Sequence, residues 1–348
     1  MNILIVKLSA IGDVIHTLPA LNAIRRHDPE GCITWLVEED AAPLIENHEA
    51  LDRVLVSKRK RWIKGLVSAS GLKNIKEAYR FLKTLRDTRY DLVIDFQGLF
   101  KSGIMAGLAR GKRKAGFGRG MDHMEYSYFF LNERVPAVAM DHHALLRSMM
   151  LLNALGIPAH EIEFKIPIRD RDRHLLEERL TKHGVKGDRP LVAVNPMAKW
   201  ETKLWSNDKF ANLADILIGQ FGVDVVFTGS PGDRKTIQHI MSAMKEKAVN
   251  LAGETTLINL AALYEKADAL VSTDTGPMHL AAAVGTPVVA LLGPTAPWRT
   301  GPFGSGHQII RTGIKCSPCY KRKCDTRECM ERISVRNVLD GVRKLEIL

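Results

Sequence analysis

The sequence predicts an α/β protein made of two doubly wound domains. Short aliphatic and β-branched runs of strand length alternate with amphipathic segments of helix length in both halves of the 348 residues. A charged segment with two prolines, residues 156–172, interrupts this alternation near the middle of the chain. We therefore expect an N-terminal domain over residues 1–160, a linker over 161–172 and a C-terminal domain over 173–348, with the last helix able to pack back on the first domain.

Composition and charge limit the class of protein. The chain is 45% hydrophobic and 26% charged, which is ordinary for a globular protein. No apolar run reaches the ~18 residues of a membrane-spanning helix, and residues 1–7 lack the basic start of a signal peptide. We therefore expect a cytoplasmic protein. The net charge of +11 favours an acidic partner, which is a nucleic acid, a phosphorylated substrate or an anionic membrane surface.

The first half opens with a strand, a loop and a helix. Residues 2–8 are aliphatic, and apolar side chains recur at helical spacing over residues 14–26. Asp13 stands at the start of this expected helix, where it either caps the helix or presents a carboxylate to a ligand. The loop has a single glycine and no Lys-Ser or Lys-Thr pair, which excludes a dinucleotide fingerprint and a P-loop.

A basic arm follows in the first half. Residues 58–76 contain seven Lys or Arg and no acid, so they form either a solvated loop or an arm that binds anions, with Trp62 packing as it closes. Residues 90–102 predict another strand, turn and helix, with Asp95, Gln97 and Lys101 at the carboxyl edge of the sheet. The other elements expected in this half are strands at 33–37, 53–56 and 114–117 and helices at 75–86 and 144–155.

The second half centres on residues 271–294, which predict a strand, a turn, a helix and a second strand. Pro277 fits the first helical position. The turn presents backbone N–H groups and a helix start at the sheet edge, which suits a diphosphate, with Asp274 accepting sugar hydroxyls. Alternatively, it is a plain turn in which Thr275 or Gly276 caps the helix. The other elements expected here are helices at 173–183, 206–221 and 257–266 and strands at 191–195 and 223–228.

Four cysteines lie within fourteen residues near the end of the chain. Their spacing matches no standard zinc finger, so either they hold a structural zinc or iron–sulfur centre or they are reduced thiols. The four cysteines are Cys316, Cys319, Cys324 and Cys329.

The adjacent His142 and His143 point to different faces of a helix, so we do not expect them to chelate a metal.

Six motifs carry a resemblance to a known family. In order, they are residues 5–21, 95–102, 203–205, 227–230, 250–255 and 272–279. Through them the chain resembles the lipopolysaccharide heptosyltransferases of glycosyltransferase family 9 over essentially its full length, and its first half is most similar to heptosyltransferase I. The resemblance implies a GT-B fold, in which two Rossmann-like domains face each other across a cleft. It also implies an ADP-heptose donor in the second domain and a lipid-linked acceptor in the first.

The resemblance also implies roles for individual residues. Asp13 would be the base of an inverting transfer, and Lys203 would stabilise the leaving ADP. The loop at 197–200 departs from the family because it lacks paired hydroxyls there, and Lys199 would substitute. The donor-binding residues would be Ser9, Lys199, Lys203, Asp233, Thr255, Asp274, Thr275, Gly276 and His279. We assign Arg59, Lys60, Arg61, Lys64, Gln97 and Lys101 to the acceptor.

The resulting expectation is an enzyme that moves heptose from ADP-L-glycero-D-manno-heptose to the 3-deoxy-manno-octulosonate (Kdo) of the lipopolysaccharide inner core. It would act as a monomer on lipid A–Kdo at the cytoplasmic face of the inner membrane, without a cofactor and without a nucleic-acid partner. The alternatives are heptosyltransferase II or another family 9 enzyme with a different acceptor, and a non-catalytic polyanion-binding protein. An acid such as Asp13 beside a donor motif favours an enzyme, because a pure polyanion binder has no use for it.

Overall fold

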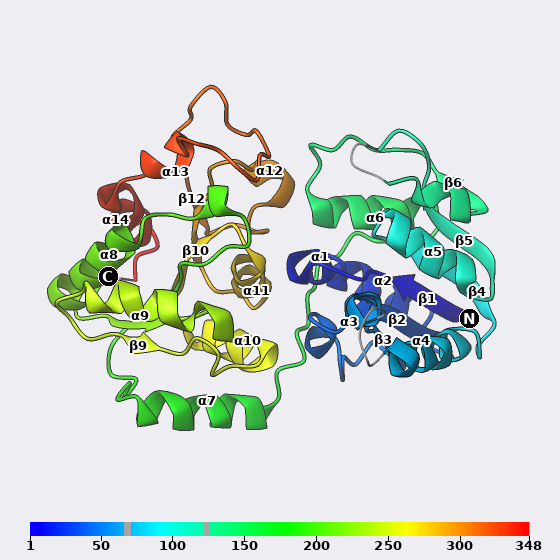
Figure 1. Ribbon diagram of the computed structural model, residues 1–348, viewed down its shortest axis with the longest axis horizontal. Helices are drawn as coiled ribbons and strands as arrows, with labels where there is room; N and C mark the ends of the chain where they lie inside the picture. The colour runs from blue at the N-terminus through cyan, green and yellow to red at the C-terminus, as the bar shows by residue number, and fades with distance from the viewer. Residues whose placement is uncertain (66–70, 122–124, 348) are drawn as a thin grey trace. The chain divides into compact units, whose positions relative to one another are not determined.

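The structure is a computed structural model that describes residues 1–65, 71–121 and 125–347 (Figure 1). The chain forms two compact units, Met1–Pro167 and Ile168–Leu348. Each unit contains one parallel six-stranded sheet with helices, so the predicted α/β class is confirmed. None of the helices in the described part of the chain is both long and apolar enough to cross a bilayer.

The N-terminal sheet is organised around β1 (Asn2–Val6), which pairs with β2 on one side and β4 on the other. Ile3, Leu4 and Ile5 are fully buried, as expected for the central strand of a parallel sheet that is covered on both faces. The strand order is β3-β2-β1-β4-β5-β6. The remaining bounds are β2 Cys32–Glu38, β3 Arg53–Ser57, β4 Tyr90–Asp95, β5 Gly111–Phe117 and β6 Glu133–Val135.

The single helix expected at residues 14–26 is wrong, because the structure has two helices there. Helix α1 (Ile11–Ile15) ends before Pro19, which lies in the first turn of α2 (Leu18–His27). Proline has no N–H to donate, so it suits a helix start and does not continue a helix from the preceding turn. The other helices of this unit are η1 Ala42–Leu44, α3 Arg59–Gly65, α4 Gly71–Leu85, α5 Phe100–Leu108, η2 Ser127–Phe130 and α6 Ala144–Ala154.

The C-terminal sheet has the strand order β12-β11-β10-β7-β8-β9. Its central strands, β7 (Leu191–Asn195) and β10 (Ala269–Thr273), are buried along their whole length. The edge strand β12 (Gln308–Ile310) was not predicted, since three residues give no recognisable period. The remaining strands are β8 Asp224–Phe227, β9 Val249–Asn250 and β11 Val288–Leu291.

The helices of the second unit follow the predicted alternation, with shifted boundaries. Helix α7 (Asp170–Lys182) begins inside the segment expected to be a linker. Helix α11 (Gly276–Ala283) begins at Gly276, one residue before Pro277, which was the expected first helical position. The others are η3 Glu201–Lys203, α8 Asn207–Phe221, η4 Pro231–Asp233, α9 Arg234–Ser242, α10 Leu257–Lys266, α12 Pro297–Thr300, α13 Glu328–Glu331 and α14 Val335–Arg343.

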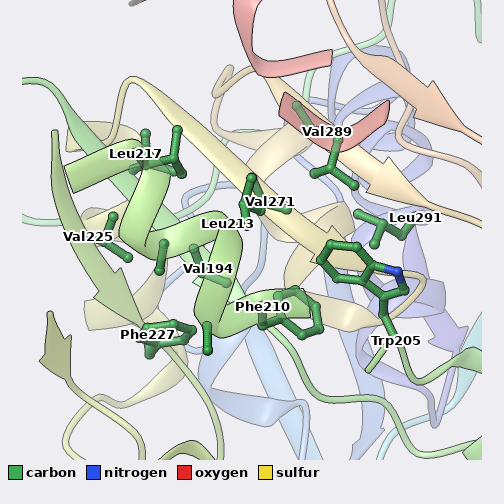
Figure 2. Packing of buried hydrophobic residues seen from close by; sticks show 14 of the residues in the cluster. Val194, Trp205, Phe210, Leu213, Leu217, Val225, Phe227, Val271, Val289 and Leu291 are labelled. Atoms are coloured by element: carbon green, nitrogen blue, oxygen red, sulfur yellow. The ribbon is translucent and has the colours of Figure 1, made fainter. Parts of the chain in front are cut away.

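A hydrophobic cluster in the core of the second unit lies between α8 and the sheet (Figure 2). Trp205 packs edge-on against Phe210, and its indole N–H donates to the carbonyl of Ile333 at 2.9 Å. Helix α14 buries Val338, Leu339 and Val342 in the same cluster. From the sequence, we expected that the last helix could pack on the first domain. In the structure its apolar face packs within the C-terminal unit.

Candidate active site

The loops that follow β1 and β4 are joined at the carboxyl edge of the first sheet. The side-chain carbonyl of Gln97 accepts hydrogen bonds from the backbone N–H groups of Leu8 (3.0 Å) and Ser9 (3.1 Å). Backbone donors at a strand end need such partners when they are shielded from water. Gln97, assigned to the acceptor from the sequence, therefore supports the loop that precedes Asp13.

Asp13 is the third residue of α1, so the alternative in which it is the N-cap of the helix is wrong. Its carboxylate accepts a hydrogen bond from the N–H of Ala10, the residue just before the helix, at 3.0 Å. This bond fixes the side chain at the helix start. Asp13 is half-buried and lines a cavity of about 220 Å³ together with Lys7 and Arg147. The carboxylate is thus held in place beside two cations at a cavity.

A second acid, Asp95, is the last residue of β4, and its carboxylate is occupied by hydrogen bonds within the protein. One carboxylate oxygen accepts from the N–H groups of Gln97 and Gly98, and the other accepts from the Ser102 hydroxyl. Burial raises the pKa of Asp95 to about 6, although these hydrogen bonds and the Lys7 charge oppose the rise. Asp95 is 1% exposed, so of the two acids Asp13 has the better access to a substrate.

Lys7 is buried next to both acids. Its ammonium group donates to the carbonyl of Phe96 at 2.9 Å. Burial lowers the pKa of Lys7, while the carboxylates of Asp13 and Asp95 raise it. A cation in this position balances the negative charge that the two acids bring to the sheet edge.

Ser9 and the basic arm are linked through a buried acid that the sequence analysis missed. The ammonium of Lys101 lies 2.6 Å from the Ser9 hydroxyl and 3.5 Å from the Glu38 carboxylate. Arg59 and Lys60 each lie 3.1 Å from that carboxylate. Burial alone would raise the pKa of Glu38, but hydrogen bonds and charge from Lys60, Lys101 and Arg59 hold it below its usual value.

The arm is helical at Arg59–Gly65, so the alternative of a solvated loop is wrong for these residues. Arg61 pairs with Glu77 of α4 at 2.5 Å, and Lys60 pairs with Asp40 at 2.6 Å. Trp62 is buried, with its N–H donating to Glu77 at 3.0 Å. Local acids therefore partly neutralise an arm that looked free of acid in the sequence, whereas Lys64 stays exposed. Residues 66–70 of the arm lie outside the described residues.

In the second unit, the structure brings Lys203 and Asp274 together. The Lys203 ammonium lies 2.7 Å from Oδ2 of Asp274, and the side chains are 15% and 4% exposed. Thr295, which follows β11, donates its hydroxyl proton to the same oxygen. The pair fixes the lysine at the carboxyl edge of the sheet. Sequence reasoning named Lys203 and Asp274 separately and missed Thr295.

Helix α11 begins beside this pair. Thr275 is its N-cap, with an extended backbone and no side-chain hydrogen bond to the helix, and Pro277 lies in the first turn. Pro277 has no N–H and the Met278 N–H donates to the carbonyl of Thr275 at 3.1 Å, so the Gly276 N–H and the helix dipole are what favour an anion at this end. Gly276 forms the first helical residue, and His279 is buried in the same turn.

Two further loops meet at the carboxyl ends of β8 and β9. Asp233 accepts from the N–H (2.8 Å) and the hydroxyl (2.6 Å) of Ser230, which orders the first loop. Gly253, at φ 75°, packs so closely that a Cβ there would lie 2.8 Å from Cα of Pro231. Thr255 is half-buried just beyond it. The predicted donor residues Asp233 and Thr255 therefore belong to adjoining loops.

An aromatic side chain that sequence reasoning did not assign borders the Lys203 site. The Trp200 ring has the Lys203 ammonium 4.6 Å and the Arg322 guanidinium 4.9 Å from its centroid. The Thr202 hydroxyl donates to the carbonyl of Lys321 at 2.8 Å. These contacts fasten the cysteine-bearing loop to the loop that carries Lys203. Lys199, by contrast, is exposed.

The four clustered cysteines line one cavity of about 530 Å³. Cys329 is buried and the others are more exposed, and no disulfide joins them. Burial raises the pKa of Cys329, whereas backbone hydrogen bonds from Arg327 and Thr326 lower the pKa of Cys324. Among the residues that the structure describes, no group of three or more His, Cys, Asp or Glu is placed to hold a metal ion.

The chain is similar to known proteins over most of its length. A model of glycosyltransferase family 9 (heptosyltransferase) matches residues 78–330. Lipopolysaccharide heptosyltransferase 1 of Pseudomonas aeruginosa is 32% identical, over 93% of this chain and 87% of the relative.

Solved structures give the same picture. The Escherichia coli heptosyltransferase WaaC with ADP superimposes with a TM-score of 0.79 at 25% identity, covering 99% of this chain and all of the other. The E. coli ADP-heptose lipopolysaccharide heptosyltransferase II also gives a TM-score of 0.79 at 23% identity, over 99% of this chain and 98% of the other. At 23% identity, the similarity to heptosyltransferase II is evidence for the fold alone.

Proposed function

The chain belongs to glycosyltransferase family 9, and we propose that it transfers heptose from ADP-heptose to the Kdo of the lipopolysaccharide inner core. Its two parallel six-stranded sheets agree with the GT-B fold of solved heptosyltransferases. It is a glycosyltransferase, and the names of its curated relatives favour the heptosyltransferase 1 reaction.

One observation carries the proposal for the donor site: the ammonium of Lys203 is fixed by Asp274 next to the start of α11. As the bond between the heptose and the diphosphate breaks, negative charge grows on the departing ADP. A held cation and the positive end of a helix dipole stabilise such charge without reorganising. The second carboxylate oxygen of Asp274 would accept a hydrogen bond from a heptose hydroxyl.

We assign the acceptor to the N-terminal unit. The Asp13 carboxylate would take the proton from the acceptor hydroxyl while that oxygen bonds to the anomeric carbon and ADP leaves from the opposite face. One displacement of this kind inverts the anomeric centre and needs no protein nucleophile. Lys7 and Arg147, which line the same cavity, suit an acceptor sugar that carries a carboxylate.

The proposal includes the setting of the reaction. The enzyme would act as a monomer on lipid A–Kdo at the cytoplasmic face of the inner membrane, and it would need no cofactor. Support comes from the side chains themselves, since Lys203 and the α11 start offer the leaving diphosphate the positive partners that a metal ion supplies in other glycosyltransferases.

The test is to incubate the protein with ADP-heptose and either lipid A–Kdo or its heptosylated product, and to measure ADP release and the mass of the lipid. We expect ADP release and a gain of one heptose with lipid A–Kdo. Turnover only with the heptosylated lipid would instead support heptosyltransferase II. No turnover with any acceptor, together with tight binding of polyanions, would support the non-catalytic alternative.

A further inference from the structure

Helix α4 in the N-terminal unit exposes a stripe of large apolar side chains. Leu72, Ile75 and Tyr79 are 86%, 53% and 68% exposed. Their spacing of three and four residues places them on one helical face. Ile63 of the neighbouring α3 is 55% exposed. Single exposed apolar residues are common, but such a stripe on one helix is typical of a surface that binds something.

The opposite face of α4 already has its packing partners. Asn74 and Leu85 are buried, and Phe81 packs against the Trp62 ring of α3 at 5.1 Å between centroids. Figure 1 shows α3 and α4 within the N-terminal unit, and the two helices are in contact. The exposed stripe is therefore additional to the apolar surface that holds the helix in place.

A row of positive charge runs beside the stripe. Lys76, Arg80 and Lys83 are exposed and spaced by four and three residues, so they form the adjoining strip of the helix. None of the three has an ion pair among the described residues. The single acid of α4, Glu77, pairs with Arg61 of α3. The exposed surface of α4 is thus apolar on one side and unneutralised cationic on the other.

We propose that α4 docks on an anionic lipid bilayer, with Leu72, Ile75 and Tyr79 inserted at the level of the headgroups and the adjoining lysines and arginine against lipid phosphates. An amphipathic helix with this division binds in the plane of a membrane interface. Charge complementarity decides the occupant, because the flanking charges are all positive and the membrane surface is negative. This inference rests on the proposed function, since a lipid-linked acceptor makes such a surface useful.

Helix α4 is joined to the acceptor edge by contacts that run through α3. Glu77 of α4 holds Arg61 and Trp62, and Arg59 of the same α3 reaches Glu38. Glu38 in turn lies 3.5 Å from Lys101, which contacts Ser9. Docking through α4 would therefore hold the edge that carries Asp13 near lipid headgroups, from which the acceptor sugar projects.

Vesicle sedimentation with the full-length protein tests the proposal. Vesicles of phosphatidylethanolamine and phosphatidylglycerol are compared with vesicles of phosphatidylcholine. We expect wild type to bind the anionic vesicles. Leu72→Ser with Ile75→Ser and Tyr79→Ser should weaken binding at least tenfold. Lys76→Glu with Arg80→Glu and Lys83→Glu should weaken it by roughly 10²-fold, since each basic residue near the surface contributes about 1 kcal/mol.

A control variant combines both kinds of change on α7 of the other unit, with one apolar and two basic residues replaced at exposed positions: Leu175→Ser, Arg171→Glu and Lys182→Glu. This variant should bind anionic vesicles like wild type. Because all substituted side chains are exposed, melting temperatures should stay close to that of wild type. Unchanged vesicle binding by both α4 variants would overturn the proposal. The proposal would also be overturned if wild type did not bind vesicles but formed a concentration-dependent dimer that the apolar variant could not form. The occupant of the stripe would then be a second copy of the chain.

Activity separates this inference from the proposed function. The apolar α4 variant should transfer heptose to a deacylated, water-soluble acceptor within about twofold of wild type, and to vesicle-embedded acceptor at least tenfold more slowly. Vesicle binding through α4 by a wild-type protein that transfers no heptose would refute the function and leave the docking surface. Heptose transfer by wild type, with vesicle binding that the α4 variants leave unchanged, would support the function and refute the docking surface.

Discussion

At the scale of single residues, the candidate site depends on charges that are fixed by neighbours before any substrate arrives. Lys203 is held by Asp274, and Asp13 is held by the N–H of Ala10. Sequence reasoning identified all three side chains of the expected chemistry, Asp13, Lys203 and Asp274, because they fall in recognisable motifs. It did not identify Thr295, the partner of Asp274, or Glu38, the partner of Lys101, because the fold brings these side chains together from separate parts of the chain. It also did not assign Trp200, which lies only three residues before Lys203.

Removing the Lys203 ammonium should weaken stabilisation of the leaving diphosphate. We expect Lys203→Ala to lower kcat/KM by roughly 10²–10³, the scale of one preorganised electrostatic partner. It also leaves the buried Asp274 carboxylate unpaired, so the melting temperature should fall. The double variant Lys203→Ala/Asp274→Asn should recover part of that stability and none of the activity. Lys186→Ala, at an exposed position outside the assigned site residues, is the control, and an equal loss there would refute a special role for Lys203.

Asp95 should make the unfolding free energy depend on pH. Its folded-state pKa of about 6 lies above its ordinary value of 3.8, so the unfolded chain releases this proton at lower pH than the folded chain does. The contribution of Asp95 to the free energy of unfolding is therefore fully present below about pH 4 and is lost as pH rises through about 6. The loss is about 3 kcal/mol, from 1.36 kcal/mol for each pKa unit.

The measurement is denaturant unfolding of wild type and Asp95→Asn between pH 4 and pH 7. The wild-type value minus the Asp95→Asn value should fall with rising pH, since the asparagine does not titrate. A difference that stays flat, or that rises with pH, would mean that Asp95 is not held in the buried, protonation-favouring environment described above.

At the scale of elements, strand prediction succeeded where burial is complete and failed at two short edge strands. β1, β7 and β10 are continuous apolar runs because both faces of a parallel sheet are covered. The three-residue edge strands β6 and β12 carry too few apolar residues to show a pattern. The basic arm was misjudged for a different reason: acids that neutralise it, Glu38, Asp40 and Glu77, lie outside the run that was counted.

Lys64 is the residue of α3 best placed to test an acceptor role for the arm. Arg59→Glu is a poor choice, because it would set a second carboxylate against the buried Glu38. We expect Lys64→Glu to raise the KM of a deacylated, phosphorylated acceptor several-fold, with ADP-heptose KM unchanged. The acceptor KM of wild type should also rise with salt, because exposed charges are screened within ~10 Å at 0.1 M.

The matched control for the arm is Lys186→Glu, an exposed charge reversal in the other unit. It should leave both KM values unchanged. If Lys64→Glu raised the KM of both substrates by the same factor, the arm would serve the structure of the unit and not recognition of the acceptor.

At the scale of the whole molecule, the sequence predicted two α/β units because each half repeats the same alternation of buried strand and amphipathic helix. The second unit begins at Ile168 and α7 at Asp170, inside the expected linker, since the charged residues of that segment form the first turn of a helix. The net charge of +11 agrees with the proposed phosphorylated donor and anionic membrane. Charge alone could not separate these partners from nucleic acid, and the site residues are what favour the first two.

The transfer rate of Asp13→Asn shows whether this carboxylate is the base of the reaction. Asparagine keeps an oxygen that can accept from the Ala10 N–H, so the melting temperature should stay within a few degrees of wild type. We expect kcat to fall by roughly 10²–10⁴ through loss of general-base catalysis, while calorimetric affinity for ADP-heptose stays within a few-fold. A kcat within threefold of wild type would mean that the proton of the acceptor goes to another group and that Asp13 is not the base.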